Sequence, residues 1–246
     1  VHDTSASGAT LFIEPIAVID ANNKLRELEA SETHEIERIL YDLSASLSAF
    51  SGELRLNYDN ITFLAFIFGC AQLSFNMDAR EPVITEKREA SLINARHPLI
   101  PAKDVVPVTV RLGGEYSMLV ITGPNTGGKT VSLKTLGLLS MMAQSGLHIP
   151  CKSGSQICVF DKIFPDIGDE QSIEQSLSTF SAHMTSIVSI LSEMTPKSLV
   201  LLDELGAGTD PVEGAALATA VLEHILASGA LCAATTHYAE LKAFAI

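Results

Sequence analysis

The sequence predicts an α/β fold: a mostly parallel sheet with helices on both faces, preceded by a helical arm. Three observations lead to this prediction. Residues 16–51 contain neither Gly nor Pro and carry apolar residues at helical spacing. From Pro82 onward, short β-type runs alternate with helical patterns, which is typical of a parallel sheet. A glycine-rich loop separates one of these strands from the helix that follows it.

The arm is expected to occupy residues 1–80. A loop and a short strand around Leu11–Ile13 come first. Apolar residues then recur at steps of four and three, as they do along one face of a long helix: Ile36, Leu40, Leu43, Leu47 and Phe50. We expect one or two helices here, ended or bent at Gly52, and a further helix over Tyr58–Met77. The pattern indicates no chemistry in the arm itself.

The second domain is expected over residues 81–246, and its boundary lies near Arg80–Glu86, where the helical periodicity stops. The β-type runs predict strands at 92–93, 105–106, 108–110, 117–122, 156–160, 199–203 and 231–235. The intervening patterns predict helices at 129–145, 178–194 and 213–227.

The glycine-rich loop has the pattern G-x-x-x-x-G-K-T, and it lies between a buried strand and a helix, as a phosphate-binding loop requires. Backbone N–H groups of such a loop and of the helix N-terminus surround a polyphosphate. The candidate nucleotide-binding residues are Gly123, Pro124, Asn125, Thr126, Gly127, Gly128, Lys129, Thr130 and Val131. Lys129 is expected to reach the β- and γ-phosphates, and the Thr130 hydroxyl to hold Mg²⁺. The alternative is a glycine-rich turn with an incidental lysine.

Two acids follow the apolar run Leu199–Leu202. In a parallel sheet, ligands bind beyond the carboxyl ends of the strands. Asp203 is therefore a candidate Mg²⁺ ligand, and Glu204 a candidate acceptor of a proton from the attacking water. Without the glycine-rich loop, a solvated acidic turn would be the better interpretation.

Three further stretches narrow the type of protein. Ser178 stands where a helix should begin, either as an ordinary N-cap or as a ligand to a phosphate held by a second subunit. Gly206–Pro211 follows the acids directly, as a flexible turn or as a route for signals across an interface. His237 lies just past the strand predicted at 231–235, which makes it a candidate γ-phosphate sensor.

Taken together, these stretches resemble the MutS family of ABC-type ATPases. The order matches throughout: Arg96-His97-Pro98, GPNTGGKT, STF, LLDELGAGTD and TTHYAEL. Residues 2–15 and Gly206–Pro211 resemble the MutS-two branch more closely than the mismatch-repair proteins. The resemblance covers essentially the whole chain.

The resemblance implies dimers that hold ATP and Mg²⁺ between subunits. Lys129, Thr130, Asp203, Glu204 and His237 would act in one subunit, and Ser178 would approach the γ-phosphate bound by the other. Relatives from mismatch repair have an acidic residue near the position of Gln171, which is assigned here to the nucleotide site. They also have an aromatic residue beside the adenine. The apolar residues available for that contact here are Val105 and Val106.

The resemblance also implies that residues 1–80 are the end of a helical core and lever. Members of this branch bind branched DNA and restrain recombination, or act on stalled ribosomes, and many carry a C-terminal nuclease domain. The implied activity of this segment is the hydrolysis of ATP to ADP and phosphate. Binding to DNA or ribosomes and any nuclease activity would belong to regions outside it. A nucleotide-gated interaction module and a transporter-type ABC ATPase are the alternatives. The latter would need an L-S-G-G-Q signature where Ser178-Thr179-Phe180 stands.

Composition limits the partners and the compartment. The net charge of −13 argues against electrostatic binding to nucleic acid or anionic membranes by this segment alone. The four cysteines lack metal-site spacing, and reduced thiols in a cytoplasmic protein are expected. The uncharged run from Asn60 to Met77 is interrupted by polar residues, which favours a buried helix over a membrane span. Because the chain begins at Val1 and ends soon after His237, we expect a piece of a longer protein, cut short before its dimerising helices.

Overall fold

The computed structural model describes residues 3–4, 11–12, 15–123, 128–168, 176–238 and 241. The chain divides into two compact units, Val1–Phe66 and Ile67–Ile246. Helix α2 (Ser51–Asn76) begins in the first unit and ends in the second. In the described part of the chain, no helix combines the length and the apolar character that are needed to cross a bilayer.

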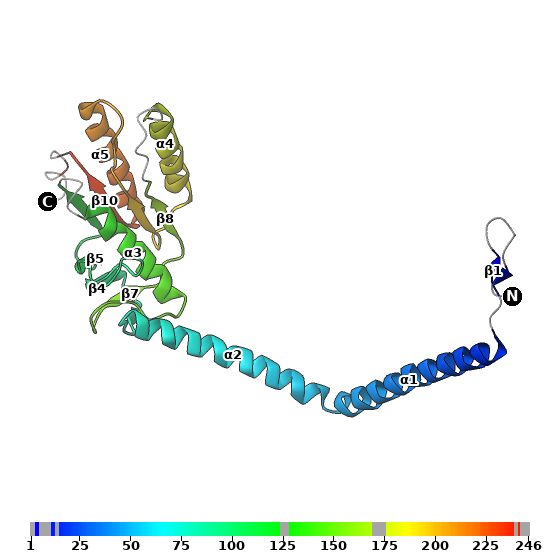
Figure 1. Ribbon diagram of the computed structural model, residues 1–246. Helices are drawn as coiled ribbons and strands as arrows, with labels where there is room; N and C mark the ends of the chain where they lie inside the picture. The colour runs from blue at the N-terminus through cyan, green and yellow to red at the C-terminus, as the bar shows by residue number, and fades with distance from the viewer. Residues whose placement is uncertain are drawn as a thin grey trace. The chain divides into compact units, whose positions relative to one another are not determined.

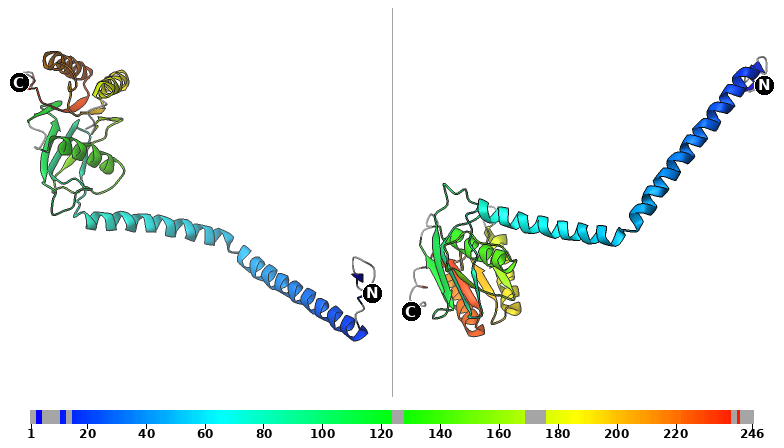
Figure 2. Two further views of the ribbon diagram at one scale, coloured as in Figure 1. Left: turned by 45° about the horizontal axis from the view of Figure 1, so that its top comes forward. Right: turned by 90° about the horizontal axis from the view of Figure 1, so that it is seen from below.

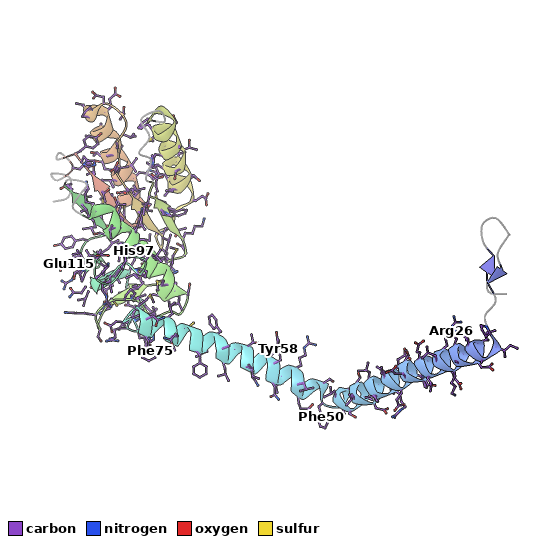
Figure 3. The ribbon with its side chains drawn as sticks, in the orientation of Figure 1. Arg26, Phe50, Tyr58, Phe75, His97 and Glu115 are labelled. Carbon is purple, nitrogen blue, oxygen red and sulfur yellow. The ribbon has the colours of Figure 1, made fainter. Side chains whose placement is uncertain are left out.

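The first unit consists mainly of helix. Strands β1 (Asp3–Thr4) and β2 (Leu11–Phe12) pair antiparallel and precede α1 (Ile16–Ser48), which continues without a break (Figure 2). The predicted strand and long helix are therefore present, and α1 ends shortly before Gly52. No residue of α1 or α2 is buried, so the helix expected to be buried over Asn60–Met77 is exposed instead. The side chains of Arg26 in α1, Tyr58 in α2 and Phe50 in the turn between them project away from the backbone (Figure 3). The apolar stripe of α1 is thus exposed.

A four-stranded parallel sheet forms the centre of the second unit. Its order is β6-β10-β9-β8, and every neighbouring pair is parallel. The strands are β6 (Met118–Thr122), β10 (Leu231–Thr236), β9 (Leu199–Leu202) and β8 (Ile163–Asp166). Because all four run the same way, their carboxyl ends meet at one edge. The parallel α/β arrangement predicted from the alternating pattern is confirmed.

Helices cover both faces of this sheet (Figure 1). The helices are α3 (Lys129–Gln144), α4 (Ser176–Glu193) and α5 (Pro211–Ser228). Alternate residues of β9 face opposite sides: Leu199 and Leu201 pack with α3, whereas Val200 and Leu202 pack with α4 and α5. Burying each leucine stabilises the fold by about 1.5–3 kcal/mol. The apolar run of β9 therefore fits a strand that is covered on both faces.

A second sheet, in the order β3-β7-β4-β5, contributes to the core on the α3 side. Its strands are β3 (Val83–Thr85), β7 (Gln156–Cys158), β4 (Glu89–Ala95) and β5 (Val108–Gly113). Only β3 and β7 pair in parallel; β4 runs antiparallel to both of its neighbours. The second unit is thus a parallel sheet joined to a mainly antiparallel one.

Prolines account for two differences from the predicted strands. The run Val105–Val106 is not a strand: Asp104 and Val105 donate backbone hydrogen bonds to the Pro101 carbonyl in a turn, and β5 begins only after Pro107. A proline fixes φ and lacks the N–H that a strand needs. Conversely, β8 is absent from the predicted strands, and it contains Pro165, a residue that is rare in strands away from a sheet edge. It is tolerated because β8 lies at the edge of the sheet.

Candidate functional site

The carboxyl edge of the parallel sheet brings the two main motifs together. Strand β10 lies between β6, which leads into the glycine-rich loop, and β9, which leads into the acids. Thr236 pairs with Thr122 of β6, and Ala234 pairs with Leu202 of β9. Neighbouring strands are about 4.8 Å apart, so the ends of β6 and β9 lie roughly 10 Å from each other. This width leaves room for phosphate groups between the loop and the acids.

Lys129 is buried at this edge, with 4% of its surface exposed. It is the first residue of α3, and the preceding Gly128 has a left-handed conformation with φ of 74°. Its ammonium donates hydrogen bonds to the carbonyls of Gly123 (2.5 Å) and Thr236 (3.4 Å). Thr130 is partly buried beside it, and Val131 is more exposed. The ammonium thus lies at the loop and the strand end, where it can exchange carbonyl oxygens for phosphate oxygens.

The two acids are held by hydrogen bonds to neighbouring strands. Asp203 is buried, with 7% exposed, and its carboxylate accepts a hydrogen bond from the Thr235 hydroxyl. The same hydroxyl accepts a bond from the Glu204 N–H at 2.8 Å, and the Asp203 N–H donates to the Asp166 carbonyl at 2.9 Å. Asp203 is therefore fixed on both sides by backbone and hydroxyl groups.

Glu204 has a strained backbone, with φ of 49° in the left-handed region. A residue other than glycine in that region costs about 1–3 kcal/mol and is common where function requires a particular direction. Its side chain is 45% exposed, in contrast to that of Asp203. The strained backbone turns the Glu204 carboxylate toward solvent, next to the buried Asp203 carboxylate. This difference is expected if Asp203 binds a metal ion and Glu204 activates water.

His237 lies between the lysine and the second acid. Its Nδ1 is 3.5 Å from the Lys129 ammonium, and its Nε2 is 3.6 Å from Glu204 Oε1. An ammonium can only donate, so Nδ1 accepts and Nε2 carries the proton that faces the carboxylate. The imidazole therefore connects the phosphate-binding lysine with the exposed acid.

A pocket of about 190 Å³ adjoins the acid pair on the α4 side. Asp166, His183, Asp203 and Glu204 line it together with the loop Gly206–Gly208. Asp166 Oδ2 and His183 Nδ1 are 3.0 Å apart. Neither Asp166 nor His183 was predicted as a site residue, and neither was Thr235. The sequence signal for Thr235 was its position two residues before His237; Asp166 could be found only once β8 was recognised.

The structure gives less information on the remaining predicted residues. Val105 lines a second pocket, of about 300 Å³, with Arg96 and His97, and Val106 is 82% exposed. Burial and the nearby Lys134 lower the pKa of His97. Ser178 belongs to the first turn of α4, but its side chain is not described. The predictions for Pro124, Asn125, Thr126, Gly127 and Gln171 lie outside the described residues.

The residues present fit a magnesium nucleotide. The Asp203 carboxylate and the Thr130 hydroxyl are hard oxygen donors, which suit Mg²⁺. Within the described ranges, no group of three or more His, Cys, Asp or Glu side chains could hold a metal ion by itself. Mg²⁺ usually keeps several waters and binds phosphate oxygens as well as one or two carboxylates, so the Asp203 carboxylate and the Thr130 hydroxyl suit it.

Comparison with known proteins gives consistent matches. Residues 119–245 match the family model described as MutS domain V. The proteins named Endonuclease MutS2 from Brevibacillus brevis and Clostridioides difficile are 60% and 58% identical over 245 and 246 residues. That from Alkaliphilus oremlandii is 56% identical over 246 residues. Each alignment covers 100% of this chain but 31% of the relative, so the chain spans about a third of the length of these curated relatives.

Proposed function

Because the chain belongs to the MutS family, in its MutS2 branch, we propose that it binds and hydrolyses ATP for a protein of this branch. MutS domain V is an ABC-type P-loop ATPase domain, and this membership removes the transporter-type alternative. One observation supports the proposal above all: the Lys129 ammonium and the Asp203–Glu204 pair flank the end of β10, with His237 between them.

The proposed reaction is an in-line attack of water on the γ-phosphorus, which breaks the bond to the β-phosphate oxygen and releases ADP and phosphate. Lys129 stabilises the negative charge that develops on the phosphates. Glu204 orients the water and takes its proton. His237 contacts the γ-phosphate and reports its presence to Glu204. Thr130 and Asp203 would hold Mg²⁺, which when bound neutralises charge on the β- and γ-oxygens.

We further propose that the full-length protein is a cytoplasmic homodimer that places Ser178 of one subunit near the γ-phosphate bound by the other. Gln171, Val105 and Val106 remain proposed nucleotide contacts. Residues 1–80 are proposed as the end of the core and lever, and residues 81–246 as the ATPase domain. The ATP state would control clamping on branched DNA or stalled ribosomes, and any nuclease activity would belong to other regions. The alternative is an interaction module gated by nucleotide, in which hydrolysis is incidental.

Phosphate release by the full-length protein tests the proposal. Glu204→Gln keeps the size of the side chain but removes the base, so ATP binding should persist while turnover falls by about 100-fold or more. Glu223→Gln, which changes an exposed glutamate on α5, is the matched control and should leave turnover unchanged. Unchanged hydrolysis in Glu204→Gln would remove that residue from the proposed role.

The same assay with branched DNA or ribosomes separates the proposed partners from the alternative. Stimulation of turnover by one of them supports a clamp on that partner. If neither changes turnover while nucleotide alters another binding activity, the gated module is favoured.

A further inference from the structure

The Asp166–His183 hydrogen bond joins helix α4 to the strand edge that carries the acids. Asp166 is the last residue of β8, and its backbone carbonyl accepts from the Asp203 N–H at 2.9 Å. Its side chain, with 9% exposed, accepts from His183 Nδ1 at 3.0 Å. A carboxylate can only accept, so Nδ1 carries the proton. One residue therefore contacts Asp203 through its backbone and α4 through its side chain.

The first two turns of α4 also contact the loop that follows the acids. Gly208 lies against Phe180 so closely that a Cβ added at Gly208 would be 3.5 Å from the Phe180 Cβ. A Cβ added at Gly168 would be 3.5 Å from His183 Cε1. The described start of α4 thus approaches the neighbouring segments at two points, with Phe180 beside Gly208 and His183 beside Asp166 and Gly168.

These two contacts differ in kind. The contact of Phe180 with Gly208 is apolar and undirected, whereas the hydrogen bond of His183 has a fixed direction and length. Both contacts lie at the pocket of about 190 Å³ that adjoins the acid pair. The α4 side chains that are buried against the sheet, Ile187 and Ile190, lie one and two turns further along the helix. The hydrogen bond of His183 is therefore a directional contact nearer to the start of α4.

We propose that His183 is a positioning residue for hydrolysis, which fixes the start of α4, and with it Ser178, relative to the acid pair through Asp166. The inference rests on the proposed ATPase function and adds a residue to it. His183 acts through Asp166, not on the nucleotide. Its loss should therefore lower turnover and leave nucleotide affinity nearly unchanged, because small displacements of a catalytic group cost rate rather than binding.

The test measures ATP affinity and turnover of the full-length protein for wild type, His183→Ala, His183→Asn and Met184→Leu. In His183→Ala, turnover should fall by roughly 10- to 100-fold, with a change in ATP Kd below about threefold. Asn can place an amide N–H near the position of Nδ1, so His183→Asn should recover most of the rate. Met184→Leu alters the packing of the same pocket without a hydrogen bond and should behave as wild type.

A double-mutant cycle with Asp166→Ala tests whether His183 acts through Asp166. If His183 acts through Asp166, the double variant should be no slower than the slower single variant. Independent losses that multiply, or wild-type turnover in His183→Ala, would overturn the inference. Lys129→Ala in the same series tests the proposed ATPase function separately from the role of His183. If Lys129→Ala loses ATP binding while His183→Ala keeps normal turnover, the ATPase function is supported and only the role of His183 is removed.

Discussion

The Thr235 hydroxyl makes two hydrogen bonds that shape the acid pair. It donates to the Asp203 carboxylate and accepts from the Glu204 N–H, so one side chain orients the buried acid and supports the left-handed backbone of the next residue. Thr235 is itself buried in the middle of the sheet. The positions of both acids therefore depend on a neutral residue of a neighbouring strand.

Replacing Thr235 with valine tests this dependence. Valine keeps the β-branched shape but leaves a buried acceptor and a donor without their partner, which should cost about 1–3 kcal/mol of stability. Turnover should fall as well, because Asp203 and Glu204 lose their common support. Thr219→Val on α5, which loses only a bond to the Ala215 carbonyl, is the control. Urea unfolding and phosphate release provide the two measurements; a Thr235→Val protein with wild-type stability would contradict the account.

At the scale of single residues, the sequence indicated the candidate site residues that belong to short, contiguous motifs. Lys129, Asp203 and Glu204 belong to short motifs, each attached to an apolar strand, and strand order brings them to one edge. Asp166 and His183 could not be predicted in this way. They lie 17 positions apart on a strand and a helix, and only the packing of α4 against β8 brings them together.

At the scale of elements, two glycines set how closely the loop after the acids packs on α5. Gly206 has φ of 85°, and a Cβ there would lie 2.5 Å from the Gly214 carbonyl oxygen. Tyr238 donates a hydrogen bond from its hydroxyl to the Gly206 carbonyl at 2.8 Å. The loop Gly206–Gly208 is therefore not merely a flexible turn: it is fixed against the N-terminal end of α5 and the segment that follows β10.

Gly206→Ala should destabilise the protein more than Gly208→Ala does. Both positions have positive φ, with 90° at Gly208, and share a backbone cost of about 1–2 kcal/mol. At Gly208 the added Cβ makes only an ordinary contact with Phe180, whereas at Gly206 it collides with backbone atoms. Overpacking of this kind adds about 1–3 kcal/mol. Denaturant midpoints of the two variants provide the comparison. Equal losses of stability in both variants would show that the backbone around Gly206 adjusts to the added Cβ without cost.

The positions of the helices could be predicted from the sequence, whereas the strands near prolines could not. Helices α1, α3, α4 and α5 were predicted from apolar spacing within a few residues of their observed ends. The strand predicted at Val105–Val106 is wrong, because Pro101 and Pro107 shape a turn there. Strand β8 was missed, and its Pro165 is tolerated because β8 lies at a sheet edge. Sequence spacing alone does not tell an edge strand from a loop.

At the scale of the whole molecule, the net charge disfavours nucleic acid as a partner of these residues, whereas the exposed apolar surface favours a protein partner. The segment carries a net charge of −13, which opposes phosphate backbones. The apolar residues along α1, among them Leu40 and Leu47, are 58% and 60% exposed. Exposed apolar stripes of this extent usually mark surfaces that bind other protein segments. If the proposed contact with nucleic acid exists, it should therefore not depend on electrostatic attraction by these 246 residues.

Fluorescence anisotropy with labelled branched DNA tests that expectation. The segment alone should show no binding at about 50 mM salt, a condition under which phosphate contacts are strong. The full-length protein is the positive control and should bind with an affinity that falls as salt increases. Salt-dependent binding by the segment alone would place a basic surface within it despite its net charge.

Lys129 is proposed to bind a magnesium-bound triphosphate at the end of β10, and the proposed function depends on this contact. Calorimetric titration of the full-length protein with ATP and Mg²⁺ tests it most directly. Lys129→Ala should lose about 2–5 kcal/mol of binding free energy, the usual cost of removing one member of a buried charged pair. Lys152→Ala, at an exposed lysine, should bind as wild type does. An unchanged ATP affinity in a folded Lys129→Ala protein would contradict the account.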